Sequence, residues 1–225
     1  ITGRGLARCE AAAASVGTFC VRLVQDIAAV AGWRAMAELY ASHEPKLDIL
    51  VHNAGVDVSG SGFADYPEEA WNDVMDVNIR APFFLTQALH PALKAAGSSD
   101  RPAKVINIAS IDGLRLNAID AYAYYASKSG LIFMTRRLAA ELVDDNIVVT
   151  CIAPGAFSSD MNEAARDKAD LVAQRIPARR IGSDEDIQGA AIYLASRAGD
   201  WVIGDTIIVD GGVTMAKYFH PDPIM

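Results

Sequence analysis

Residues 105–110 read Val-Ile-Asn-Ile-Ala-Ser, and residues 124–128 read Tyr-Tyr-Ala-Ser-Lys. The first run is typical of a buried strand that ends in Ser110, and the second places Tyr124 and Lys128 on one face of a helix. A lysine ammonium near a phenol favours the phenolate, because opposite charge stabilises the ionised form. The pattern predicts that Tyr124 is a general acid/base and that Ser110 hydrogen-bonds the reacting oxygen. An exposed helical pair without a catalytic role has the same spacing.

Short apolar runs alternate with helical patterns along the rest of the chain. The apolar runs predict strands at 19–24, 47–51, 105–109, 148–152 and 206–209. The segments between them predict helices at 28–41, 67–95, 122–143 and 184–197, with Pro82 kinking or dividing the longest one. Strands that alternate with helices form βαβ units, and strands that are apolar throughout have both sheet faces covered. We therefore expect an α/β fold with a doubly wound, mostly parallel, Rossmann-like sheet in a single domain over residues 1–225.

Charge and composition argue against several functional classes. The 225 residues carry a net charge of −8, whereas a nucleic-acid surface needs a basic face. We expect no membrane partner, because no apolar run has the length of a membrane span. Cys9, Cys20 and Cys151 are scattered without metal-ligand spacing. They favour buried thiols in a reducing compartment, the cytoplasm, and no metal site.

Two turns of small residues follow predicted strands. Residues 53–55 read Asn-Ala-Gly, and residues 154–159 read Pro-Gly-Ala-Phe-Ser-Ser. Ligands bind at the carboxyl edge of open α/β sheets, so both turns are candidate ligand sites. Gly55 would let a ligand approach the backbone, and Asn53 could bridge neighbouring strands. Each turn is also consistent with an ordinary strand ending.

Asn78 lies in the middle of the predicted helix 67–95, between apolar neighbours. Asparagine is a mediocre helix former, because its side chain competes for backbone hydrogen bonds. Asn78 is therefore expected either to distort the helix and expose a carbonyl group, or to be a solvated or locally bonded residue. His52, next to Asn53, is interpreted as a buried histidine rather than a catalytic one.

Taken together, these motifs resemble the short-chain dehydrogenase/reductase family. The Asn-Ala-Gly turn, the helix asparagine, the serine, the Tyr-x-x-x-Lys pair and the Pro-Gly turn match the family pattern in order, over a resemblance that spans Ile1 to Gly212. Residues 121–124 and 153–157 look most similar to the 3-oxoacyl-acyl carrier protein reductase-like branch. Substrate range within this fold is wide, so the branch does not name the substrate.

The resemblance implies a nicotinamide cofactor and a role for each matched residue. Tyr124 would give or accept the proton, Lys128 would lower its pKa and hold the nicotinamide ribose, and Ser110 would polarise the substrate carbonyl. Asn78 would hold a water that relays protons. Further cofactor contacts are implied at Asn53, Ala54, Gly55, Pro154, Gly155, Phe157 and Ser159, and at Asp26 and Ile27 beside the adenine. From the sequence alone, Asp26 is equally a helix N-cap.

The front of the chain departs from the family pattern. Family members begin with a strand and a Thr-Gly-x-x-x-Gly-x-Gly turn that binds the pyrophosphate, whereas residues 1–9 read Ile-Thr-Gly-Arg-Gly-Leu-Ala-Arg-Cys. We interpret residues 1–4 as the end of the second strand. The first strand and first helix are then expected to be missing from this sequence, as in a truncated form. Because that strand lies inside the sheet, such a chain alone is expected to be unstable and to bind cofactor poorly.

On this alignment Arg4 indicates which cofactor binds. An acidic side chain at the end of the second strand favours the ribose 2′-hydroxyl of NAD, whereas arginine accommodates the 2′-phosphate of NADP. Residues 1–8 contain no Asp or Glu. NADP, as NADPH, is therefore favoured over NAD, although Arg4 could also be a plain surface cation.

We expect an NAD(P)-dependent oxidoreductase that interconverts a ketone and a secondary alcohol on a small molecule, with acyl-linked substrates included. Residues 158–180, with a charged, helix-like stretch at 160–174, would form a substrate lid. The resemblance implies a homotetramer, with interfaces at 67–95, 122–143 and the C-terminal strand, and a tail, 215–225, that reaches a neighbouring subunit. The main alternative is a cofactor-deficient, non-enzymatic homologue acting as an oligomerisation or regulatory module. A sugar-nucleotide dehydratase or epimerase would need a larger C-terminal domain.

Overall fold

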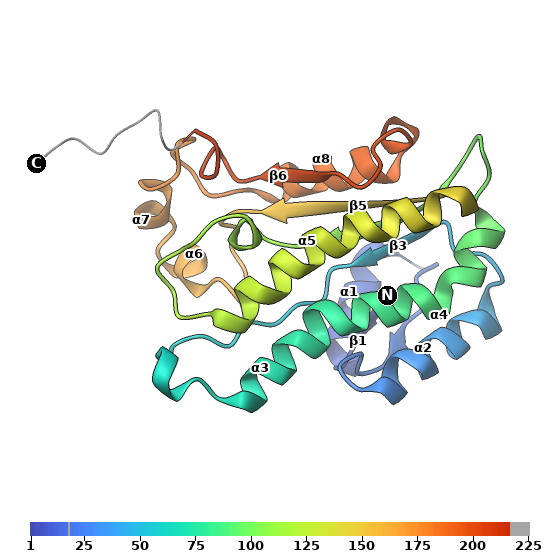
Figure 1. Ribbon diagram of the computed structural model, residues 1–225, viewed down its shortest axis with the longest axis horizontal. Coiled ribbons are helices and arrows are strands. Elements are labelled where there is room, and N and C mark those ends of the chain that lie inside the picture. Colours follow the sequence, from blue (N-terminus) through green and yellow to red (C-terminus); the bar gives the residue numbers. More distant parts are fainter. Residues whose placement is uncertain (18, 217–225) are drawn as a thin grey trace, which may run out of the picture.

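The strands form two parallel sheets in the computed structural model, which describes residues 1–17 and 19–216 (Figure 1). Strand β1 (Thr2–Gly3) pairs with β2 (Leu23–Val24). The larger sheet has the order β3 (Ile49–His52), β4 (Ala103–Ile108), β5 (Ile147–Pro154) and β6 (Thr206–Val209). All of these pairings are parallel, and parallel neighbours need crossover connections, which the helices supply. The expected α/β fold with a parallel sheet is confirmed.

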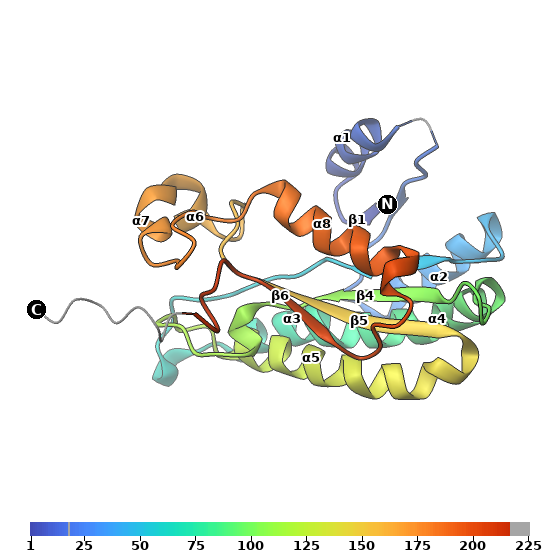
Figure 2. The same cartoon turned by 90° about the horizontal axis from the view of Figure 1, so that it is seen from above.

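Helices cover both faces of the larger sheet (Figure 2). On one face α4 packs on β4 and α5 packs on β5, and on the other face α8 contacts β4, β5 and β6. The helices are α1 (Leu6–Val16), α2 (Val30–His43), α3 (Glu68–Met75), α4 (Ala81–Ala96), α5 (Tyr122–Leu142), α6 (Glu163–Asp167), α7 (Ala169–Ala173) and α8 (Asp184–Ala195). Shorter turns are η1 (Phe63–Asp65), η2 (Asp76–Arg80), η3 (Ile111–Gly113), η4 (Val143–Asp145) and η5 (Arg197–Gly199). Among the described residues, no helix is long and apolar enough to cross a membrane.

Neighbouring residues of β4 point to different cores. Val105 packs with Leu93 of α4 and Ala139 of α5, whereas Ile106 packs with Leu194 of α8. Because successive side chains of a strand face opposite sides of the sheet, a strand covered on both sides must be apolar at every position. This explains why the central strands appear in the sequence as continuous apolar runs.

The two sheets are separate within the described part of the chain, where no strand lies between β1 and β3. On β3, Ile49 and Val51 are 40% and 48% exposed, in contrast to the buried residues of β4 and β5. Apolar side chains at these positions are normally covered in a parallel sheet. The residues that the structure describes therefore do not form the first strand and helix of the expected arrangement, as the sequence indicated.

Three element boundaries differ from the sequence-based predictions. The strand predicted at 19–24 contains only Leu23 and Val24, because its partner strand β1 has two residues. Phe19, outside the strand, is 99% exposed. The charged helix expected within the lid is two helices of five residues each, α6 and α7. The helix predicted at 67–95 is divided as expected, but the division is the π-helical turn η2, which ends before Pro82. The tail at 215–225 was expected to reach a neighbouring subunit. From residue 217 onward it lies outside the part of the chain that the structure describes.

Candidate active site

The functional candidates gather at the carboxyl edge of the larger sheet, where β3 leads to Asn53, β4 to Ser110 and β5 to Gly155. Helix α5 begins at the same edge and carries Tyr124 and Lys128 in its first two turns (Figure 1). Parallel strands end on one side of a sheet, so residues far apart in the sequence meet there. Within the described residues, no group of three or more His, Cys, Asp or Glu side chains could hold a metal ion.

Lys128 is buried beneath Tyr124. Its side-chain nitrogen lies 5.5 Å from the centroid of the Tyr124 ring and donates a 2.8 Å hydrogen bond to the carbonyl of Ile108, in β4. Burial lowers the pKa of Lys128 from 10.5 to about 8, since the charged form loses its hydration. An ammonium held under an aromatic ring at a sheet edge is placed to act on a ligand, not to solubilise the surface.

The pKa of Tyr124 differs from the sequence-based expectation. It is raised from 10.0 to about 12, mainly by burial and to a smaller extent by the carboxylates of Asp112 and Asp57, while hydrogen bonding with Ser110 lowers it in part. Lys128 does not act as a cause of the shift. The pKa of this phenol is therefore raised and not lowered as the sequence predicted, because desolvation is the dominant effect.

Ser110 is positioned by the turn that follows it. Its hydroxyl oxygen accepts a 3.1 Å hydrogen bond from the amide of Asp112, which caps η3. A Cβ atom at Gly113 would lie 2.7 Å from the carbonyl carbon of Lys128. Only glycine lets η3 approach α5 this closely, so Gly113 helps to bring the Ser110 hydroxyl to Tyr124. The role of Gly113 was not predicted from the sequence, where only its place three residues after Ser110 could have indicated it.

Asn78 connects the Asn-Ala-Gly turn to α5. Its side-chain oxygen accepts from the amide of Val56, and its side-chain nitrogen donates to the Val56 carbonyl, both at 2.9 Å. The same nitrogen donates to the Ser127 hydroxyl at 3.1 Å. With these bonds Asn78 is 1% exposed. The predicted distortion of the helix is confirmed, but the side chain is fully engaged by protein groups.

The backbone carbonyl of Asn78 has a different status. In an α-helix it would accept from the residue four positions later, which is Pro82 and has no N–H. The chain forms the π-helical turn η2 instead, in which the amide of Ala81 donates to the carbonyl of Asp76. π-helical turns occur frequently at functional sites. Pro82 thus leaves the Asn78 carbonyl without the donor that an α-helix would give it.

The turn at 53–55 borders the lysine. Asn53 and Ala54 are exposed at the end of β3. A Cβ atom at Gly55 would lie 3.3 Å from the Lys128 side-chain nitrogen and 3.5 Å from the Asn78 side-chain oxygen. Glycine thus leaves the ammonium approachable from the sheet edge. His52 is buried and directs its Nε2 atom to the Thr86 hydroxyl at 2.8 Å, so its interpretation as a buried histidine is correct.

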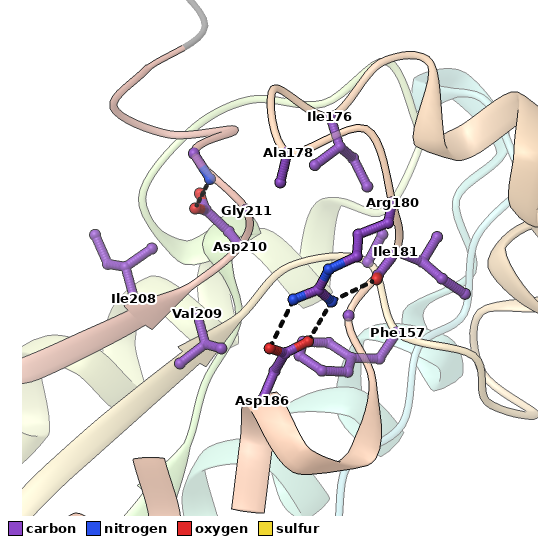
Figure 3. Close-up of a pocket in the computed structure, with 13 residues that line it drawn as sticks. Phe157, Ile176, Ala178, Arg180, Ile181, Asp186, Ile208, Val209, Asp210 and Gly211 are labelled. Carbon is purple, nitrogen blue, oxygen red and sulfur yellow. Dashed lines mark hydrogen bonds and ion pairs between the residues drawn. The ribbon is translucent and has the colours of Figure 1, made fainter. Parts of the chain in front are cut away.

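The Pro154–Ser159 turn lies beside β6. The Gly155 amide donates to the carbonyl of Val209, and the Phe157 backbone forms a β-bridge with Gly182. Phe157 also lines a cavity of about 310 Å³ between this turn, β6 and the segment around Arg180 (Figure 3). The Arg180 guanidinium donates to the Asp186 carboxylate at the edge of this cavity. The Ser159 hydroxyl accepts from the amide of Asn162. None of the catalytic candidates lines this cavity.

The residues expected at the adenine end are more dispersed. Arg4 is exposed after β1. Asp26 follows β2, and one of its carboxylate oxygens accepts from the amide of Ala28 at 3.0 Å. The first residue of α2 is Val30, so Asp26 forms a local turn and is not the helix N-cap. Ile27 packs against the cluster around Trp33.

The residues present fit part of a nicotinamide dinucleotide. The exposed Asn53 and Ala54, the open face of Gly55 and the Lys128 ammonium form a cradle at the sheet edge suited to a ribose and its neighbouring ring. The described residues contain no Gly-rich turn of the kind that binds a pyrophosphate. The described residues therefore fit the nicotinamide half of the cofactor, which contains the reacting ring.

Comparison with known proteins gives a consistent result. A family model described as "Enoyl-(Acyl carrier protein) reductase" matches residues 1–214. The chain is 39% identical, over 196 residues, to a rhamnolipids biosynthesis 3-oxoacyl-[acyl-carrier-protein] reductase of Pseudomonas aeruginosa, covering 86% of this chain and 76% of the relative. It is 37% identical to a 2-dehydro-3-deoxy-D-gluconate 5-dehydrogenase of Dickeya dadantii, covering 88% and 78%.

Solved structures agree with the sequence relatives. The RhlG/NADP active-site complex of Pseudomonas aeruginosa superimposes with a TM-score of 0.90 at 36% identity, covering 96% of this chain and 86% of that one. A gluconate 5-dehydrogenase of Burkholderia cenocepacia, in complex with NADP and tartrate, gives a TM-score of 0.84 at 31% identity, covering 95% and 84%. Both values indicate the same fold over nearly the whole chain.

Proposed function

The chain belongs to the short-chain dehydrogenase/reductase family, and we propose that it is an NADP-dependent oxidoreductase that interconverts a ketone and a secondary alcohol. The observation that carries the proposal is the buried Lys128 ammonium under the Tyr124 ring at the edge where β4 ends in Ser110. Holding a lysine there costs stability, and a purely structural position has no need of it.

In the proposed reaction, Tyr124 gives its phenolic proton to the carbonyl oxygen of the substrate, and Ser110 donates a hydrogen bond to the same oxygen. A pKa of about 12 keeps the phenol protonated at neutral pH, which suits proton donation in the direction of reduction. A bound NADPH would supply the hydride. Lys128 would hold the ribose and return a proton to the phenolate that remains after the proton has left.

We place the return of the proton at Lys128 and the Asn78 carbonyl. The pKa of Lys128, about 8, lets the amine exchange a proton near neutral pH. The Asn78 side chain is committed to Val56 and Ser127. The carbonyl of Asn78, left without its α-helical donor, is therefore the group we assign to a relay water.

Arg4 supports NADP over NAD. No carboxylate is present in residues 1–8 to receive a ribose 2′-hydroxyl, and an exposed guanidinium at the end of β1 suits a 2′-phosphate. Two of the similar structures are named as NADP complexes. We also assign Asn53, Ala54, Gly55, Asp26, Ile27, Pro154, Gly155, Phe157 and Ser159 as cofactor contacts. Titration with both cofactors tests the assignment, and tighter binding of NADH would contradict it.

The decisive experiment replaces Tyr124 by phenylalanine and follows NADPH oxidation with a 3-oxoacyl thioester. Tyr124→Phe is expected to abolish turnover while NADPH binding is retained, because the ring remains and only the hydroxyl group that gives the proton is lost. Tyr125→Phe is the matched control, since the Tyr125 hydroxyl bonds only to the carbonyls of Asn117 and Ile119. Turnover that survives in Tyr124→Phe would remove Tyr124 from the mechanism.

A non-enzymatic role is the second candidate, favoured by the lack of a Gly-rich turn among the described residues. On this hypothesis the chain is an oligomerisation or regulatory module that does not bind a dinucleotide. Fluorescence of bound NADPH distinguishes the two, because a cofactor-deficient homologue leaves the emission unchanged. The retained Ser110, Tyr124 and Lys128 set favours the enzyme.

We further propose a single catalytic domain with a lid over about 158–180, a homotetramer and a cytoplasmic location. The lid contains α6 and α7, and its Asp160 carboxylate lies 3.6 Å from the guanidinium of Arg8 on α1. Exposed apolar side chains on α3 and α5, Trp71 and Phe133, support subunit contacts there. Free cysteines in the described residues fit a reducing compartment. The substrate would be a small carbonyl compound or alcohol, acyl-linked forms included.

A further inference from the structure

Two carboxylates stand next to the groups assigned to catalysis. Asp57 follows Val56, whose amide and carbonyl are both held by Asn78 at 2.9 Å. Asp112 lies in η3, and its amide donates to the Ser110 hydroxyl at 3.1 Å. Both carboxylates are thus anchored through their backbones to residues of the site, and neither belongs to the family motif described above.

One oxygen of each carboxylate is buried without a hydrogen-bond partner. These atoms are Oδ1 of Asp57 and Oδ1 of Asp112. Within residues 1–17 and 19–216, neither carboxylate takes part in an ion pair. A buried acceptor without a donor is costly, and native proteins seldom retain one without a reason. Beside the assigned Ser110 and Asn78, a hydroxyl donor of a bound substrate would supply the missing partner.

Burial is the main cause of the raised Tyr124 pKa, and the negative charges of both carboxylates add to it. Asp112 and Asp57 each raise the pKa of Tyr124, and Asp57 also raises the pKa of Asp112. The opposing cation is Arg115, which lowers the pKa of Asp112. Its Nε atom is buried without a partner, and its Nη1 atom donates to the carbonyl of Leu116. The guanidinium therefore does not neutralise the pair by direct contact.

Building on the proposed function, we propose that Asp57 and Asp112 select the substrate by charge. They accept hydrogen bonds from a hydroxyl group close to the ketone and repel a substrate that carries a carboxylate near that ketone. The substrate class is thus a neutral hydroxyketone, or the corresponding diol in the reverse direction. Like charges brought together in a desolvated site repel each other strongly enough to decide between such substrates.

The wild-type protein tests this with three ketones of similar size. These are 4-hydroxy-2-butanone, which offers a hydroxyl donor, 2-pentanone, which offers none, and acetoacetate, which places a carboxylate there. With NADPH, kcat/KM should fall in that order, with acetoacetate about tenfold or more below the hydroxyketone. Equal or better use of acetoacetate would overturn the charge selection. If none of the three ketones is reduced but the 3-oxoacyl thioester is, the hydroxyketone class is wrong; if the thioester is not reduced either, the proposed function itself fails.

The variant Asp57→Asn/Asp112→Asn removes both charges and retains the shape of both side chains. It should raise kcat/KM for acetoacetate relative to the hydroxyketone by about tenfold. The exposed Asp65→Asn is the matched control and should leave that ratio unchanged. A double variant with the wild-type ratio would contradict the assignment, whatever its absolute rate.

A readout independent of turnover covers the case in which the variant is inactive. The ultraviolet absorbance of tyrosinate, measured as the difference between each protein and its Tyr124→Phe counterpart, reports the ionisation of Tyr124. Removing the two carboxylates should let Tyr124 ionise at lower pH. An unchanged ionisation would show that the carboxylates do not act on the phenol and would overturn the assignment. A shifted ionisation in a protein that reduces no ketone would leave the electrostatics intact and refute only the proposed reaction.

Discussion

Replacing Lys128 by methionine should stabilise the folded protein at neutral pH while abolishing turnover. Burial lowers the pKa of Lys128 from 10.5 to about 8, and the residue is only 4% exposed. Each pKa unit corresponds to about 1.4 kcal/mol, so holding the charged lysine costs the folded state about 3 kcal/mol at pH 7. Methionine has a similar length and no charge. It loses the hydrogen bond to the Ile108 carbonyl, which costs about 1–2 kcal/mol.

The net expectation is a gain of about 1–2 kcal/mol at pH 7, with a defined pH dependence. Between pH 8 and 10.5 the unfolded wild-type chain binds the Lys128 proton more tightly than the folded one, so wild-type stability rises with pH in this window. The methionine variant lacks that rise. Its advantage should shrink by about 2 kcal/mol between pH 7 and pH 9.5.

Urea unfolding followed by circular dichroism at these two pH values measures both quantities. The exposed Lys46→Met serves as the control for removal of a charge and should show no such pH dependence. A Lys128→Met protein that is clearly less stable at pH 7, or whose difference from the wild type is the same at both pH values, would refute the reasoning. The expected trade of activity for stability is typical of functional sites.

Two further changes test the support of the site. Gly113→Ala places a Cβ atom 2.7 Å from the Lys128 backbone, so it should cost about 1–3 kcal/mol in urea unfolding and lower kcat, and unaltered stability would contradict the close approach of η3 to α5. His52 has its pKa lowered to about 4 by burial, so wild-type stability should fall by about 2–3 kcal/mol as the pH falls from 6.5 toward 4, while His52→Gln should lose less over the same range. Equal acid losses in the two proteins would show that His52 is not held neutral.

The sequence predicted the strands correctly where a short partner strand does not limit their length. The runs at 105–109, 148–152 and 206–209 correspond to β4, β5 and β6, because a strand covered on both faces must be apolar throughout. The run at 19–24, which is apolar except for Arg22, was predicted on the same basis, yet only two of its residues form β2. Strand length depends on the partner as well as on the residues, and the pattern within one run contains no information about its partner.

The residues of the candidate site also divide into those that the sequence identified and those that only the folded structure revealed. Their residue types and order identified Ser110, Tyr124 and Lys128, and Asn78 was marked as a helix distortion before its contacts were known. The distortion takes the form of a π-helical turn tied to Val56. Gly113 and the carboxylates of Asp57 and Asp112 were missed, since their importance arises from neighbours that are distant in the chain.

The amino-acid sequence by itself determined the alternation of strands and helices, the edge of the sheet that carries the chemistry and the identity of the groups placed there. These follow from periodicity and local spacing, which short segments contain within themselves. The ionisation of those groups was decided only by the tertiary structure. Spacing alone indicated an acidic phenol, but packing buried Tyr124 near two carboxylates and made it a weaker acid. Desolvation and charge proximity are set by all the atoms around a group, and these come together only when the chain has folded.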